Sequence, residues 1–150
     1  MAFARKADEE GLTKVAKLFR AAVEAEALHA SNHLQVMGEV RSTKGNVGAT
    51  LAGETSECDK MHLGCLNTAK VESNQQAAWT FDVASMVEQI HAKVFSEVAE
   101  QPENNEELRQ VDYYVCTICG NTLEVAAPER CPIWRPPKAK PFKVDQCGRL

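Results

Sequence analysis

The sequence lacks proline over its first hundred residues. All six prolines lie from Pro102 onward, and five of them fall within residues 128–141. Proline breaks helices, whereas the Ala, Glu, Leu, Lys and Gln that dominate the region before Pro102 favour them. We therefore predict that this region is entirely helical. The proline-rich end, with its VDYYVCTICG stretch, predicts short strands and loops in a second, small module that begins at about Val111.

Three further absences narrow the class of protein. No apolar run approaches the roughly 18 residues of a membrane helix, and the first ten residues lack the apolar centre of a signal peptide. Positive charge is not in excess either, since 17 Lys and Arg stand against 21 Asp and Glu for a net charge of -4. We therefore expect a cytoplasmic protein with neither a membrane nor a nucleic acid as partner. A length of 150 residues suits one domain with a small appendage.

The helical part divides into three full helices and one partial helix. Periodicity and turn residues predict helices from Thr13 to about Met37, from residues 43–46 to about Lys70, and from about Gln75 to Glu100. Residues 1–10 are expected to be the last turns of another helix. We place the domain boundary so that residues 1–107 form the helical domain and residues 111–150 the small module.

Ionisable residues interrupt the apolar stripe of each predicted helix. The first and third stripes each carry Glu-x-x-His, and the second carries Glu-x-x-Glu, so that side chains three residues apart point toward the same place. A single Glu-x-x-His is usually an ordinary surface pair, but two such pairs together with a Glu-x-x-Glu on core-facing stripes would repel one another unless cations lay among them. Carboxylate and imidazole ligands suit iron or manganese better than structural zinc. The six candidate metal ligands are Glu26, His29, Glu54, Glu57, Glu88 and His91.

Other histidines and cysteines of the helical part receive no ligand role. His33 lies one turn beyond His29 and is expected to be a core residue or a neighbour of the ligands. His62 has no position on the stripe, and we expect it to be exposed. Cys58 and Cys65 are expected to pack as small apolar groups.

A separate cysteine cluster lies in the C-terminal module. Cys116, Cys119 and Cys131 have the spacing of the knuckles that hold iron in rubredoxin or zinc in a ribbon, but Trp134 stands where a fourth cysteine would complete the pattern. Two alternatives follow. Either the three thiolates bind iron or zinc with water, another side chain or Cys147 as fourth ligand, or the module holds no tightly bound metal.

In combination these motifs resemble the rubrerythrin family over nearly the whole chain. The resemblance is carried by ADEEGLTKVAKLFRAAVEAEALHASNHL, LAGETSE, FDVASMVEQIHAKVF, YYVCTICG and APERCP. It implies a mainly α protein, with a ferritin-like four-helix bundle whose opening helix is largely missing and a small rubredoxin-like domain. It further implies an NADH-linked, cytoplasmic non-haem peroxidase that reduces hydrogen peroxide to water at a di-iron centre.

The resemblance also implies roles for individual residues. Glu26 with His29 and Glu88 with His91 match the two Glu-x-x-His pairs of the di-iron site, and Glu54 matches a bridging carboxylate. Glu57 matches the carboxylate thought to exchange with a histidine when the redox state changes. The cysteine cluster would relay electrons that come from rubredoxin or an NAD(P)H-dependent reductase, and the chain is expected to form a homo-oligomer. In this cluster the residues that match the family's rubredoxin-type metal ligands are Cys116, Cys119 and Cys131.

Two departures from the family pattern keep other functions open. The family's opening helix supplies one more glutamate, and this chain begins just past the place where that residue would stand. Trp134 is the other departure. The main alternative is therefore a degenerate, non-catalytic iron-binding relative of rubrerythrin, and a third hypothesis is a zinc-ribbon adaptor that binds a partner through the bare face of the bundle.

Overall fold

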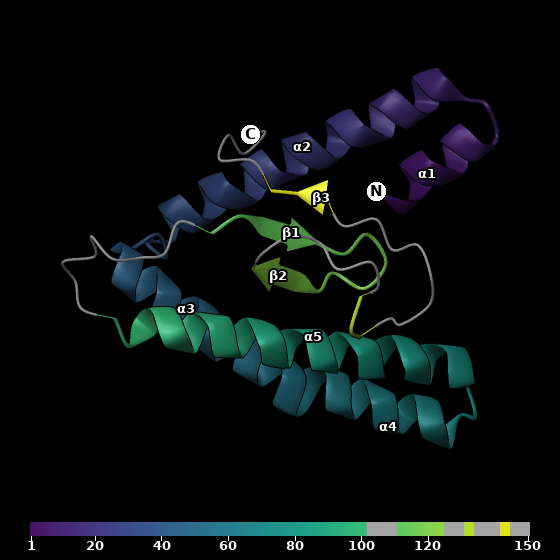
Figure 1. Cartoon of the computed structure of the whole chain (residues 1–150). Helices are drawn as coiled ribbons and strands as arrows, with labels where there is room; N and C mark the ends of the chain where they lie inside the picture. Colours follow the sequence, from purple (N-terminus) through teal and green to yellow (C-terminus); the bar gives the residue numbers. More distant parts are fainter. Residues whose placement is uncertain (102–110, 125–130, 134–141, 145–150) are drawn as a thin grey trace. The chain divides into compact units, whose positions relative to one another are not determined.

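The computed structural model describes residues 1–101, 111–124, 131–133 and 142–144. It divides into two compact units, one within residues 1–41 and the other within residues 42–145. We call these the N-terminal unit and the main unit, and Figure 1 shows the elements of both. None of the described helices is both long enough and apolar enough to cross a membrane.

The N-terminal unit is a hairpin of two helices. Helix α1 spans Ala2–Glu9 and helix α2 spans Thr13–Val36, in agreement with the prediction. Gly11 turns the chain between them with φ at +76°, a conformation that costs glycine little. Three alanines lie buried, which lets the helix backbones approach closely: Ala4, Ala7 and Ala16.

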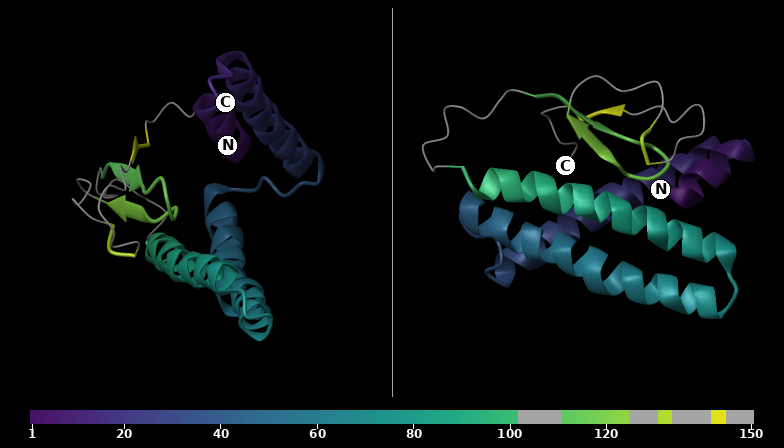
Figure 2. Two further views of the ribbon diagram at one scale, coloured as in Figure 1. Left: turned by 90° about the vertical axis from the view of Figure 1, so that its right-hand side faces the viewer. Right: turned by 60° about the horizontal axis from the view of Figure 1, so that its bottom comes forward.

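The main unit is built on a second pair of antiparallel helical segments. One segment runs without a break through α3 (Thr43–Ser56), the π-helical turn η1 (Glu57–His62) and α4 (Leu63–Val71). Helix α5 (Gln75–Ala99) packs along all three parts of it, as the two further views in Figure 2 also show. The prediction of one helix to about Lys70 and another from Gln75 is therefore confirmed, except that the first contains a wider turn.

Side-chain caps fix where these helices begin. The Ser42 hydroxyl accepts a hydrogen bond from the Gly45 amide at 3.2 Å, and the Asn74 side chain accepts one from the Ala77 amide at 3.0 Å. Each cap satisfies an amide that the first helical turn leaves without a partner. The helices therefore start at fixed residues, which sets the height of the candidate ligands along them.

Small and branched apolar residues form the core between the helices of the main unit. Cys58 is buried, as expected from the sequence, and Cys65 is half-buried. The Ser85 hydroxyl donates to the Cys58 carbonyl at 3.4 Å and so connects α5 to the π-helical turn. The remaining buried residues of this core are Leu66, Ala69, Val83 and Val87.

A three-stranded antiparallel sheet follows the helices in the main unit. Strand β1 (Tyr113–Val115) lies between β2 (Thr122–Glu124) and β3 (Phe142–Lys143). The predicted short strands of the C-terminal module are thus present. Trp134 and Cys147, on which part of the sequence prediction depends, lie outside the described residues.

Candidate metal centres

Three predicted ligands meet between α3 and α5. Glu88 and His91 lie one turn apart on α5, and His91 Nδ1 is 2.8 Å from Glu88 Oε2. Glu54 reaches the same place from α3, where its Oε2 is 3.6 Å from His91 Nδ1. All three side chains are largely buried, and their ligand atoms lie within 4.8 Å of one another. This spacing suits a single metal ion.

The electrostatics of this group favour a bound cation. Burial, together with the hydrogen bond and the charge of Glu88, raises the pKa of Glu54 above its usual range, while His91 opposes the change. Two carboxylates that face each other in a partly buried place cannot both ionise without a cost in free energy. A divalent ion would remove that cost, so the residues present fit a metal.

A second group of ligands shares Glu88 with the first. His62 Nε2 lies 3.9 Å from Glu88 Oε1 and 4.0 Å from Glu57 Oε2. The two oxygens of Glu88 therefore face different histidines, His91 and His62. Glu54 belongs to one of the two groups, whereas Glu88 belongs to both.

The expectation that His62 is exposed was wrong. Its side chain is only 13% exposed and lies among the ligands. The error came from the helical period, because in an α-helix residues five apart point about 140° away from each other. The π-helical turn over Glu57–His62 forms its hydrogen bonds between residues five apart, so that Glu57 and His62 lie on one side. No residue pattern used in the prediction distinguishes such a turn from ordinary helix.

The Nε2 edge of the His91 ring faces both polar and apolar residues. Its Nε2 lies 3.0 Å from the Thr122 hydroxyl on β2, so the other ring nitrogen remains available for a metal. A cavity of about 420 Å³ opens beside this histidine. Its lining consists of Glu54, His91, Val94, Phe95, Val98, Tyr113 and Thr122.

The remaining predicted pair lies in the N-terminal unit. Glu26 and His29 are hydrogen-bonded at 3.3 Å on α2, with side chains 77% and 61% exposed. The expected burial of this stripe was wrong for the described residues, because only α1 packs on α2 within the unit, and His33 is exposed as well. The structure thus brings together four of the six predicted ligands, all in the main unit.

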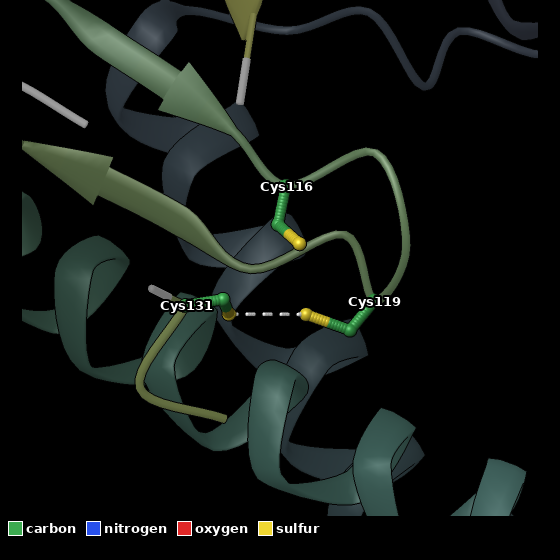
Figure 3. Close-up of side chains that lie close together, drawn as sticks. All are labelled: Cys116, Cys119 and Cys131. Carbon is green, nitrogen blue, oxygen red and sulfur yellow. Dashed lines mark hydrogen bonds between the residues drawn. The ribbon is translucent and has the colours of Figure 1, made fainter. Parts of the chain in front are cut away.

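The three cysteines of the C-terminal module converge as their spacing predicted. Cys116 and Cys119 lie at the turn between β1 and β2, and Cys131 approaches from beyond β2, as Figure 3 shows. The Cys119 and Cys131 sulfurs are 3.5 Å apart. Gly120, with φ at +80°, closes the turn by donating its amide to the Cys116 carbonyl at 3.0 Å. The adjacent Asn121 is buried.

The surroundings of Cys119 raise the pKa of its thiol. Burial first, and then the neighbouring thiols of Cys116 and Cys131, raise the pKa of Cys119 to about 12, while a backbone hydrogen bond from Asn121 acts in the opposite direction. Thiolates bind iron and zinc, whereas thiols do not. A metal ion would stabilise the three thiolates together, so this cluster also fits a metal, with three protein sulfurs in place among the described residues.

Comparison with known proteins agrees with this arrangement. The family model named Rubrerythrin matches residues 1–99, about two thirds of the chain. The chain belongs to the rubrerythrin family. It is 29% identical to rubrerythrin-2 of Clostridium acetobutylicum over 85% of this chain and 77% of that protein, and 27% identical to nigerythrin of Nitratidesulfovibrio vulgaris over 91% and 73%.

Solved structures give the same result for the fold. Nigerythrin in its partially reduced state matches with a TM-score of 0.62 and 25% identity, over 95% of this chain and 76% of that one. Its fully reduced, all-ferrous state matches with a TM-score of 0.61. The predicted ferritin-like helical fold with a small rubredoxin-like knuckle is therefore confirmed. Rubrerythrins are di-iron oxidoreductases, and the carboxylate, imidazole and thiolate groups found here suit iron.

Proposed function

We propose that this member of the rubrerythrin family reduces hydrogen peroxide to water at a di-iron centre. The observation that supports the proposal most directly is the pair of ligand groups joined by Glu88, which offers positions for two metal ions side by side. Two ferrous ions held there would supply the two electrons that break the O–O bond. The predicted ligands remain Glu26, His29, Glu54, Glu57, Glu88 and His91, with Cys116, Cys119 and Cys131 as the second metal site.

The side chains have distinct tasks in this proposal. Glu88 would hold the ions through its carboxylate, and Glu54 and His91 would be further ligands. Thr122 fixes the plane of the His91 ring through Nε2.

The cavity beside His91 gives the substrate a place to enter. Its volume of about 420 Å³ exceeds what a molecule as small as peroxide needs, and Val94, Phe95 and Val98 make part of its wall apolar. Polar groups reach it from Glu54, His91 and Thr122. This lining would admit peroxide to the ligand groups while limiting the number of water molecules beside them.

Electrons would arrive through the cysteine knuckle in residues 111–150, which we propose as a domain separate from the helical residues 1–107. Rubredoxin or an NAD(P)H-dependent reductase is the proposed donor, in a cytoplasmic setting. Apolar side chains exposed along α2, among them Leu18, Leu28 and Leu34, support a homo-oligomer in which another copy covers them.

Stopped-flow oxidation of the ferrous protein tests the proposal. The full chain is loaded anaerobically with ferrous iron, mixed with hydrogen peroxide and followed by the absorbance of ferric iron. We expect rapid oxidation that Glu88→Gln abolishes and Glu97→Gln, an exposed change on the same helix, leaves intact. Equal rates in the Glu88→Gln variant and the unaltered protein would refute the proposed centre.

The exposure of Glu26 and His29 favours one second candidate, a non-catalytic iron-binding relative. Such a protein would bind iron through the main unit but would not turn over. A steady-state assay with NADH and a competent reductase separates the two functions, since sustained peroxide consumption excludes the second candidate and a single turnover supports it.

A further inference from the structure

His62 is the histidine of the main unit's described helices that the proposed ligand list does not include. It ends the π-helical turn, and its Nε2 faces two carboxylates that come from different elements, Glu57 on η1 and Glu88 on α5. Its other ring nitrogen, Nδ1, is buried and has no hydrogen-bond partner among the described residues. The polar groups that face the ring therefore lie at Nε2.

The distances at Nε2 are longer than a hydrogen bond. At 3.9 Å and 4.0 Å from the two carboxylate oxygens, the nitrogen makes no direct hydrogen bond to either. Metal–ligand bonds to imidazole and carboxylate are each about 2 Å long, so one ion can bind two atoms up to about 4 Å apart. The two separations therefore lie at the upper end of the range that a shared cation can bridge.

The two groups contain the same kinds of side chain, which also supports metal binding at the second group. One group consists of Glu54, Glu88 and His91, and the other of Glu57, Glu88 and His62. Each provides one imidazole and two carboxylates, with Glu88 common to both. Two ions held in this way would have the same kinds of protein ligand, which suits a pair of ions of one element.

We propose that His62 is a ligand of the second metal ion of the centre, bound through Nε2 together with Glu57 and Glu88. The proposal rests on the di-iron centre of the proposed function and adds a histidine outside the two Glu-x-x-His pairs. Packing is the competing role for this ring, because its centroid lies 6.3 Å from that of Phe81. The variants below separate packing from metal binding.

Histidine-labelled protein provides a direct readout. The chain contains only four histidines, so ¹⁵N-histidine labelling followed by anaerobic loading with ferrous iron gives few signals to assign. A metal-bound imidazole shows strongly shifted resonances, whereas a free one does not. If His29 and His91 alone bind, two histidines shift. We expect three, and His33→Gln, which alters an exposed histidine, should leave all three in place.

Two variants of His62 complete the test. His62→Gln and His62→Phe should each remove one shifted histidine and raise the dissociation constant of one ferrous ion at least about tenfold. His62→Phe keeps an aromatic ring against Phe81, so the same loss in both variants reflects ligation rather than packing. Circular dichroism confirms that the variants retain their helices. The number of shifted histidines in the unaltered protein and in His33→Gln can be measured even if the His62 variants do not fold.

The outcomes separate this inference from the function on which it rests. Two shifted histidines, with two ferrous ions bound equally well by His62→Phe and the unaltered chain, would overturn the role of His62 and leave the di-iron centre in place. Failure of the unaltered chain to bind two ferrous ions would overturn the proposed centre itself.

Discussion

The carboxylate of Glu88 lies 2.8 Å from the imidazole of His91 through its Oε2 atom, while its Oε1 atom faces away from that ring toward His62. Residues three apart on one helix therefore do more than chelate a single ion. Glu88 belongs to both ligand groups, whereas His91 belongs to one, and the two residues should differ in what their loss does to the centre.

Iron stoichiometry checks this difference. Glu88→Gln should reduce the bound ferrous iron of the helical site from two ions to nearly none, because both positions lose a carboxylate. His91→Gln should reduce it from two ions to one. Elemental analysis after anaerobic loading and removal of loose metal measures both, with Glu97→Gln as the control. Equal losses in the two variants would contradict the sharing of Glu88.

Metal-free protein should show a stability change that depends on Glu54. The pKa of this carboxyl is raised in the folded protein, so folding favours its protonated form. The contribution of this carboxyl to stability is therefore complete below its pKa in the unfolded chain, about 4.3, and is lost as the pH rises through its higher pKa in the folded protein. Glu54→Gln cannot ionise. Urea unfolding of the metal-free proteins should show the variant gaining stability relative to the unaltered chain as the pH rises from about 4 to 8, and a constant difference would contradict this account.

The cysteine cluster should bind metal more tightly at higher pH. Because the pKa of Cys119 is about 12, a metal ion must displace its proton at any ordinary pH. The affinity for zinc should therefore rise by up to about tenfold per pH unit for each proton released. Competition with a chromophoric chelator between pH 6 and 8 measures the slope.

A matched pair of variants assigns that metal to the cluster. Cys131→Ser should lower the metal content of the module, whereas Cys65→Ser, in α4, should not. Loss of the same amount of metal from both variants would show that the cluster is not the site.

Helix α5 should depend on Val87 to hold the ligands in place. This side chain is 2% exposed, directly before Glu88 in sequence, and Val87→Ala should lower the free energy of unfolding by about 2 kcal/mol. Val36→Ala, at the end of α2 and 89% exposed, should change it by less than about 0.5 kcal/mol. Chemical denaturation of the two variants compares them, and similar losses would contradict the assignment of the core.

Much of the fold could be predicted because the helices obey local rules. The bounds of α2 and α5 agree closely with the predicted residues, since Gly11 and Asn74 mark turn and cap in the sequence itself. The convergence of Glu54 with Glu88 and His91 follows from the period of 3.6 residues. His62 could not be predicted in this way, because its position depends on a turn with a different period.

Burial of the α2 stripe was also beyond the reach of the sequence. Periodicity identifies a face that can be buried, but it does not say what covers that face. Within the N-terminal unit α1 covers only the beginning of α2, so Ala16 is buried while Glu26 is exposed. The periodicity of one helix therefore predicted burial correctly where a neighbouring helix covers the face. It failed along the part of α2 that no other helix of the unit covers.

The π-helical turn also determines how this chain can tolerate changes in length. Removing one residue between Glu57 and His62, for example Lys60, would allow ordinary helix to replace the wider turn, and the residues after it would keep nearly the same direction. Leu66 and Ala69 would then still face α5. The turn can therefore absorb the loss of one residue, whereas the same deletion within α3 or α4 would rotate every later residue by about 100°.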